Sequence, residues 1–113
     1  MDDGKVRAGG EAIVVLITVA SREEAEKIGR RLVEDRLAAC VNVIPQVRSL
    51  FTWEGTVSQE DEVLLVVKSR RARFRELAST VKQLHSYTVP EIIALPILEG
   101  AAEYLRWITD VTT

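Results

Sequence analysis

Residues 38–69, AACVNVIPQVRSLFTWEGTVSQEDEVLLVVKS, contain two β-rich runs that meet at Glu54-Gly55. Glycine beside a polar residue is typical of a tight hairpin turn, because glycine adopts positive φ without steric cost. Each run is longer than a typical strand of about 5–6 residues. The sequence therefore predicts a hairpin too long for the sheet of a small domain. Its tip must bend back, extend into solvent or pair with another chain.

A strand and a helix are predicted before this hairpin. Residues 12–20 form a continuous apolar, β-branched run, which indicates a strand buried on both faces. Ser21 and Glu24 then have the spacing of a capping box, and the helix should run to about Arg36. After the hairpin we expect Ser69 to cap a second helix. That helix, a fourth strand and a short closing helix are predicted at residues 70–86, 92–98 and 101–108.

The predicted order β-α-β-β-α-β is that of the ferredoxin-like α+β fold, with one antiparallel sheet. Right-handed crossovers give the strand order 4-1-3-2, numbered along the chain. Pro45 and Pro96 fall in the second and fourth strands, as expected for edge strands or bulges, because proline cannot donate a ladder hydrogen bond. We expect one domain over residues 12–113.

The two central strands are apolar on both faces, although two helices cover only one face of such a sheet. Together with the long hairpin, this pattern predicts that copies of the chain associate through the open face and the hairpin tips.

The totals are those of an ordinary soluble protein: 113 residues, 47% hydrophobic, 28% charged, net charge −2. No apolar run approaches the roughly 20 residues that span a bilayer, so no membrane association is expected. Residues 1–11 are polar and glycine-rich, which predicts a disordered leader and no signal peptide. Cys40 has no second cysteine to pair with, which favours the reducing cytoplasm.

The densest polar and aromatic cluster is predicted between the second helix and the fourth strand, at residues 85–91. His85 is a candidate metal ligand or proton-transfer group, but a helix C-terminal imidazole often has no further role. Glu91 is a candidate ligand or base, with a solvated carboxylate as its ordinary reading. Tyr87 fits packing better than chemistry.

Two further residues are candidates. The Cys40 thiolate suits soft metals, although a small buried cysteine is commoner. Lys68 ends a central strand and can bind an anion or pair with a carboxylate. An enzyme would use Glu91 or His85 as general base and Lys68 to hold an anion.

A basic run near residues 68–75 raises the possibility of nucleic-acid binding, and the RNA-recognition motif shares the predicted topology. That motif reads RNA with aromatic residues on its central strands. Here the central run 63–67 is VLLVV, without an aromatic residue. We therefore expect no nucleic-acid partner.

Several linked segments resemble the CutA family of divalent-cation tolerance proteins. The resemblance covers about residues 12–110 and rests on these segments in order: LAACVN at 37–42, IP at 44–45, WEG at 53–55, Glu62, Lys68, HSYTVPE at 85–91, LPI at 95–97 and YLRWI at 104–108.

The resemblance implies a homotrimer in which long hairpins pair between subunits, similar in form to the PII signalling proteins. It implies a non-enzymatic role in divalent-metal tolerance, copper included. The positions given to metal binding in the family hold Ile17 and Leu84 here, while His85 remains.

A metal site would then use Cys40, His85 and Glu91, or groups from a neighbouring subunit. The inter-subunit cleft is expected to gather seven residues around a cation or a small anionic ligand: Cys40, Trp53, Lys68, His85, Tyr87, Glu91 and Trp107. The alternatives are a PII-like sensor of small molecules, a structural scaffold with a filled cleft, and the enzyme described above.

Overall fold

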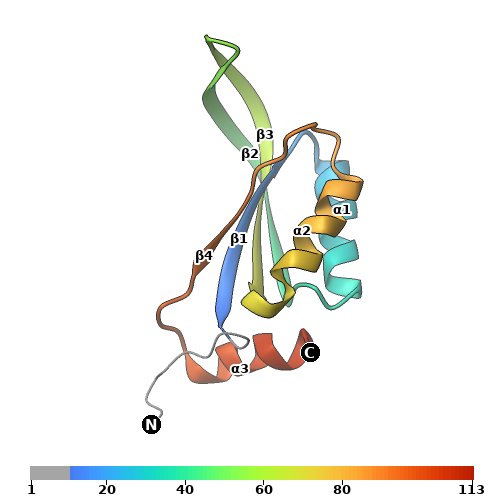
Figure 1. The fold of residues 1–113 in the computed structure, drawn as a ribbon, viewed down its shortest axis with the longest axis vertical. Helices are drawn as coiled ribbons and strands as arrows, with labels where there is room; N and C mark the ends of the chain where they lie inside the picture. Colours follow the sequence, from blue (N-terminus) through green and yellow to red (C-terminus); the bar gives the residue numbers. More distant parts are fainter. Residues whose placement is uncertain (1–10) are drawn as a thin grey trace.

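The computed structural model describes residues 11–113, whose elements follow the predicted order (Figure 1). The elements are β1 (Ala12–Val19), α1 (Arg22–Glu34), β2 (Cys40–Trp53), β3 (Thr56–Arg70), the 3₁₀ turn η2 (Arg71–Arg73), α2 (Phe74–Leu84), β4 (Ile92–Pro96) and α3 (Ala102–Val111). The leader predicted over residues 1–11 lies outside the described residues except for Glu11, so this boundary stays a prediction.

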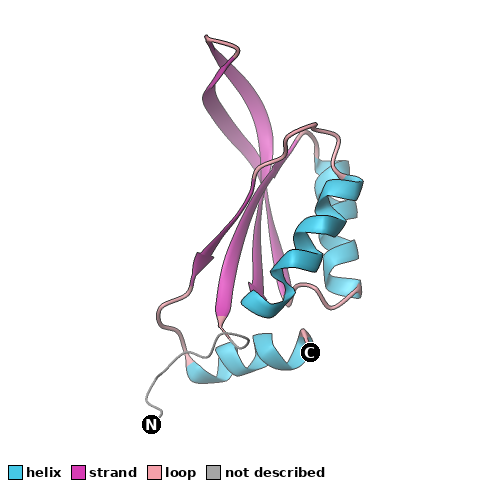
Figure 2. Ribbon diagram, in the orientation of Figure 1, coloured by secondary structure: helices cyan, strands magenta, loops and turns pink. Residues whose placement is uncertain are grey.

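The four strands form one antiparallel sheet in the order β2-β3-β1-β4, which confirms the predicted α+β topology. Helices α1 and α2 lie together against one face of the sheet (Figure 2). Pro45 lies on the edge strand β2 at a bulge between Ile44 and Val47, and Pro96 ends the other edge strand. Both prolines therefore stand where no ladder hydrogen bond is needed.

The core lies between the sheet and the two helices. Alternate residues of the central strands are fully buried there, as the two-residue period of a strand requires. They meet the apolar faces of α1 and α2. Its fully buried members include Val15, Ile17, Leu65, Val67, Ile28, Leu32, Leu77 and Val81.

Helix α1 begins with half of the predicted capping box. Ser21 Oγ accepts a hydrogen bond from the backbone N–H of Glu24 at 3.2 Å, as predicted. The Glu24 carboxylate instead accepts hydrogen bonds from Ser86, far along the chain. A residue that the local pattern assigns to helix capping is therefore used for a tertiary contact.

The predicted cap of the second helix is wrong. Ser69 belongs to β3, is fully buried, and donates its hydroxyl to the Leu37 carbonyl at 2.6 Å. The chain continues extended to Arg70, passes through η2 and enters α2 at Phe74, with no side-chain cap. The β3–β1 ladder reaches Ser69 and Arg70, and this pairing outweighs a local cap.

The hairpin forms as predicted. Glu54 and Gly55 both have positive φ, 51° and 80°, which is the backbone of a type I′ turn. Strand β1 pairs with β3 only over Val63–Arg70, so Thr56–Glu62 pairs with β2 alone. We call this two-stranded part, residues 47–62, the arm. It projects beyond the sheet (Figure 1), and the molecule measures 50 × 27 × 22 Å.

The face of the sheet opposite α1 and α2 is apolar, and we call it the open face. It is made by the other set of alternate residues, which stay partly or largely exposed: Val14, Leu16, Ile44, Leu64, Val66, Ile93 and Leu95. Helix α3 crosses only one end of the sheet (Figure 2), where Arg70 donates two 2.9 Å hydrogen bonds to Thr112. Most of the open face therefore has no cover within the described chain.

Candidate functional site

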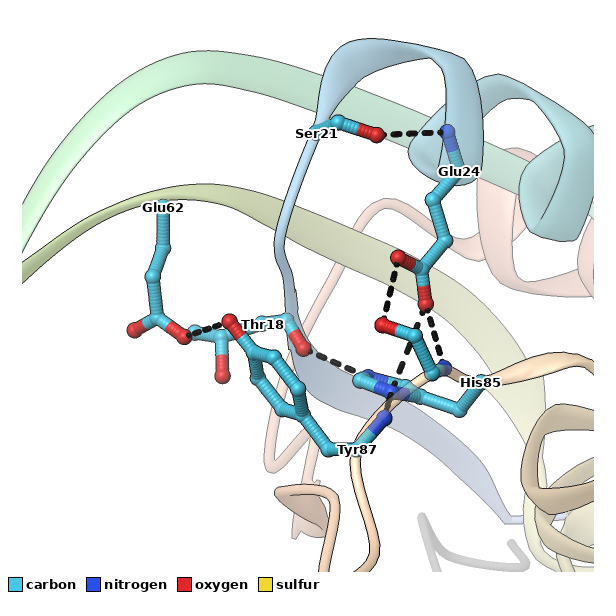
Figure 3. A network of polar contacts seen from close by, with 7 residues as sticks. Thr18, Ser21, Glu24, Glu62, His85 and Tyr87 are labelled. Carbon is cyan, nitrogen blue, oxygen red and sulfur yellow. Dashed lines mark hydrogen bonds and ion pairs between the residues drawn. The ribbon is translucent and has the colours of Figure 1, made fainter.

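A polar network joins three segments where β1 ends, α1 begins and α2 ends (Figure 3). His85 follows directly after α2, and its backbone N–H donates to the Val81 carbonyl at 2.8 Å. His85 is the last residue of the helical hydrogen-bond pattern, and its side chain contacts Thr18 at the end of β1. The network thus lies at the predicted junction between α2 and β4.

Both ring nitrogens of His85 have partners. The Thr18 carbonyl can only accept, so Nε2 donates to it at 2.7 Å. The Tyr87 backbone N–H can only donate, so Nδ1 accepts from it at 3.0 Å. These partners assign a neutral imidazole protonated on Nε2. The side chain is fully buried, and no ring lone pair remains for a metal ion.

Glu24 holds the loop from the α1 side. Its two carboxylate oxygens accept from the backbone N–H and the hydroxyl of Ser86 at 2.8 and 2.9 Å. The first of these oxygens also lies 3.4 Å from Nδ1 of His85. The loop after α2 is therefore fixed to both β1 and α1.

Tyr87 extends the network to the base of the arm. Its hydroxyl donates to Glu62 Oε2 at 2.8 Å. Burial, then the hydrogen bond to Glu62 and the negative charges of Glu62, Glu24 and Glu60, raise the pKa of Tyr87. Glu91, four residues on, accepts a longer 3.4 Å hydrogen bond from the Thr18 hydroxyl. The structure thus brings His85, Tyr87 and Glu91 close together.

A groove of about 550 Å³ lies beside this network, between the β1–α1 turn and the base of the arm. Ser21 and Arg22 form one side, while Val47, Asp61 and Glu62 form the other. It carries both signs of charge. Its shape leaves room for a small ligand or for part of another chain.

The remaining predicted residues lie elsewhere. Cys40 faces Lys68 across β2 and β3, and the Lys68 ammonium donates to Asn42. Trp53 stands beside the turn at the arm tip. Trp107 lies on α3, with its ring 5.4 Å from that of Tyr104. The structure of one chain does not gather the seven predicted cleft residues.

The predicted metal ligands also lie apart. Lys68 pairs with Val14, whereas His85 contacts Thr18, four residues along β1. At about 3.3 Å per residue, roughly 13 Å of strand separates the Cys40–Lys68 pair from the network. Within residues 11–113 no group of three or more His, Cys, Asp and Glu side chains is placed to hold a metal ion. The network of one chain does not fit a metal.

Three residues of the network were not predicted as site residues: Thr18, Glu24 and Ser86. Thr18 contributes through its backbone carbonyl, which no side-chain pattern reveals. Glu24 was assigned to a cap. Ser86 stood inside the HSYTVPE segment, which was the only sequence signal pointing to it.

Comparison with known proteins decides the family. The family model described as "CutA1 divalent ion tolerance protein" matches residues 13–111. The chain belongs to the CutA family. A CutA relative, the divalent-cation tolerance protein CutA of Thermus thermophilus, is 54% identical over 99 residues, which are 88% of this chain and 96% of the relative. The protein of that name from Archaeoglobus fulgidus is 47% identical over 96 residues, 85% of this chain and 93% of the relative.

Solved CutA structures share the fold. That of the Thermus thermophilus divalent cation tolerance protein superposes with a TM-score of 0.89 at 52% identity, covering 90% of this chain and 99% of the other. The structure of CutA1 from Oryza sativa superposes with a TM-score of 0.89 at 38% identity, covering 95% of this chain and 98% of the other. None of the helices described in this CutA chain is long and apolar enough to cross a membrane.

Proposed function

We propose that this CutA protein acts as a non-enzymatic homotrimer in divalent-cation tolerance, and that it binds its ligand between subunits. The observation that supports assembly is the open face. Exposed apolar patches of this kind mark interaction sites, because burying them is favourable by about 25 cal/mol per Å². The number three comes from the family resemblance.

The arm supports the same proposal. Both of its faces carry exposed apolar side chains, and alternation along β2 puts Phe51 and Trp53 on one face and Leu50 on the other. A two-stranded ribbon by itself is marginally stable in water. Neighbouring subunits would cover both faces of the arm.

Assembly also offers a route to the ligand. Cys40 and Lys68 lie at one end of the open face, Tyr87 and Glu91 near the other, and Trp53 at the arm tip. Adjacent subunits are needed to bring such residues together. With both nitrogens of His85 engaged, the cation ligands left among the predicted residues are the Cys40 thiolate and the Glu91 carboxylate. Copper is the cation we propose for this pair, because a thiolate favours soft metals.

Two substitutions test the assembly. Ile93 on the open face and Val33 on α1, beside the edge strand β2 on the other face of the sheet, have similar exposure, 50% and 43%. Light scattering should give a trimeric mass for the wild type and for Val33→Lys, and a smaller mass for Ile93→Lys, whose charge cannot be buried in a contact. A monomeric wild type at micromolar concentration contradicts the assembly.

Calorimetric titration with copper(II) tests the ligand. Saturable binding should be present in the wild type and lost in Cys40→Ser and Glu91→Gln, with Glu99→Gln as a matched control. In a host lacking its own CutA protein, growth on copper should be restored by the wild type and not by Ile93→Lys. If the protein is a trimer but binds no copper, the proposed assembly is supported and the proposed copper site is contradicted.

A PII-like sensor of small anions is the second candidate, favoured by the exposed ammonium of Lys68 beside the open face. Saturable binding of phosphate or a nucleotide, lost in Lys68→Ala, would support it. The predicted enzyme has less support, because Lys68 lies about 13 Å of strand away from His85 and Glu91 in the same chain.

A further inference from the structure

Glu62, at the base of the arm, has a nearly buried carboxylate without a cation beside it. The residue is 9% exposed, and the Tyr87 hydroxyl donates to its Oε2 at 2.8 Å. Glu24 and Glu60 add further negative charge around the same hydroxyl. Within residues 11–113 no lysine, arginine or histidine forms an ion pair with Glu62. Because a carboxylate buried this deeply is ordinarily paired, its counter-charge should come from outside the chain.

One oxygen of Glu62 is available to such a cation. Figure 3 shows Tyr87 bonded to one carboxylate oxygen, while the other points away from the network. This second oxygen, Oε1, accepts no hydrogen bond from the described residues and is not fully enclosed by them. A cationic side chain from another chain can therefore bond to Oε1 without displacing Tyr87.

Lys68 is a cation on the same face of β3 that also lacks a charged partner. Alternation along the strand puts four residues on the open face: Glu62, Leu64, Val66 and Lys68. The Lys68 ammonium donates to the side-chain oxygen of Asn42, which is neutral. No carboxylate in the described part of the chain forms an ion pair with it. Because an ammonium has three donors, two remain for a carboxylate.

The two charges cannot meet within one chain. They are six residues apart on one strand, which is roughly 20 Å at about 3.3 Å per residue. Leu64 and Val66 lie between them, so this part of the open face is an apolar strip with a cation at one end and an anion at the other. A second copy of the chain offers both the apolar surface and the opposite charges. Such a head-to-tail contact joins two different patches of the chain, and repeated by rotation it closes a ring.

We propose that Lys68 of one subunit forms an ion pair with Glu62 of the partner subunit, and that this pair fixes the register of the assembly. The pair rests on the proposed assembly through the open face. In a cyclic trimer each chain uses its Lys68 once and its Glu62 once. Both charges then lose water only where they gain a partner, which favours this register over those that leave a buried charge unpaired.

The same register serves the proposed copper ligands. Cys40 faces Lys68 across β2 and β3. Glu91 is bonded to Thr18, at the Glu62 end of the open face. A contact that brings Lys68 to Glu62 of the partner subunit therefore also brings Cys40 toward Glu91 of the partner subunit.

A double-mutant cycle tests the pair with substitutions that preserve the contacts inside the chain. Glu62→Gln keeps an acceptor for Tyr87, and Lys68→Gln keeps a donor for Asn42, but each removes one charge. Each single substitution should raise the dissociation constant of the assembly about thirtyfold or more, because it leaves the other charge unpaired in the contact. The double variant should be weakened no further than either single one. Light scattering over a dilution series in a fixed guanidinium concentration measures all four proteins.

Chemical cross-linking tests the positions of the two residues directly. In a Cys40→Ser background, chains with both Glu62→Cys and Lys68→Cys are treated with a short bis-maleimide. They should form covalent dimers and trimers on a denaturing gel, because the two positions are too far apart to be joined within one chain. The matched chain with Glu62→Cys and Lys27→Cys should stay monomeric on the gel.

Glu34→Gln and Lys27→Gln remove the same charges from exposed positions on α1 and should leave the dissociation constant unchanged. Additive or absent effects in the cycle overturn the proposed pair, as does an assembly that gives no cross-link. A dimeric mass with the cross-link present contradicts the proposed trimer and supports the pair. A monomeric wild type contradicts both.

Discussion

His85 and Thr18 are joined by a 2.7 Å hydrogen bond from Nε2 to a backbone carbonyl, which ties the end of α2 to the end of a central strand. With Nδ1 accepting from Tyr87, the imidazole is a structural connector. The only histidine in the chain, which the sequence offers as a candidate metal ligand, therefore has a structural role in the folded chain.

The first prediction follows from that connection. His85→Ala should lower the free energy of unfolding by about 2–3 kcal/mol, because it leaves buried backbone groups of Thr18 and Tyr87 without partners. Guanidinium unfolding measures this, with Gln83→Ala, exposed on the same helix, as the control. Copper(II) affinity, measured under conditions where both proteins are folded, should stay the same. A variant as stable as the wild type would contradict the structural role.

Alkaline pH should weaken the fold through Tyr87. Its pKa is raised by burial and by neighbouring carboxylates, whereas the unfolded chain ionises with a pKa of 10.0. Protonated Tyr87 therefore makes its full contribution to the free energy of unfolding below pH 10.0. This contribution is lost as the pH rises above 10.0 toward the folded-state pKa. Denaturant midpoints measured below and above pH 10.0 should fall less in Tyr87→Phe than in the wild type. Tyr104→Phe should behave as the wild type does.

Arg36 offers a stabilising change at the end of α1. It has φ of 59° in a Schellman motif, where Leu37 N–H donates to the Leu32 carbonyl and Arg36 N–H to that of Val33. Positive φ costs a non-glycine residue about 1 kcal/mol. Arg36→Gly should raise the free energy of unfolding by about that amount. Arg36→Ala keeps a Cβ and should give no gain, so equal effects would refute the explanation.

Glu54 offers the second stabilising change, in the arm. A type I′ turn favours asparagine followed by glycine, and Glu54 holds φ of 51° there. Glu54→Asn should raise the thermal midpoint modestly, by a few degrees for each 1 kcal/mol or so gained. Glu54→Ala should not raise the thermal midpoint, because alanine also disfavours positive φ. A loss of stability in Glu54→Asn would mean that the glutamate makes a contact with a neighbouring subunit.

Local patterns were enough to predict the turn at Glu54-Gly55 and the position of Pro45 at a sheet edge or bulge, because neighbouring residues set these backbone conformations. The continuous apolar run of β1 predicted burial on both faces, whereas one chain fully buries mainly the face that meets the helices. Ser69 and Glu24 were misassigned because a local cap and a distant partner compete for the same polar atoms. In both cases the distant partner lies in the fold, where burial makes an unpaired polar group costly.

The order of the elements, the strand order of the sheet and the resemblance to the CutA family follow from the amino-acid sequence, because they depend on hydrophobic period, turn residues and linked motifs along the chain. Three relationships are visible only in the folded chain: both ring nitrogens of His85 are occupied, Cys40 lies apart from Glu91, and Tyr87 bonds to Glu62 at the base of the arm. Those relationships join residues up to 67 positions apart. Distances between such residues follow from how the helices pack on the sheet, and no local pattern contains them.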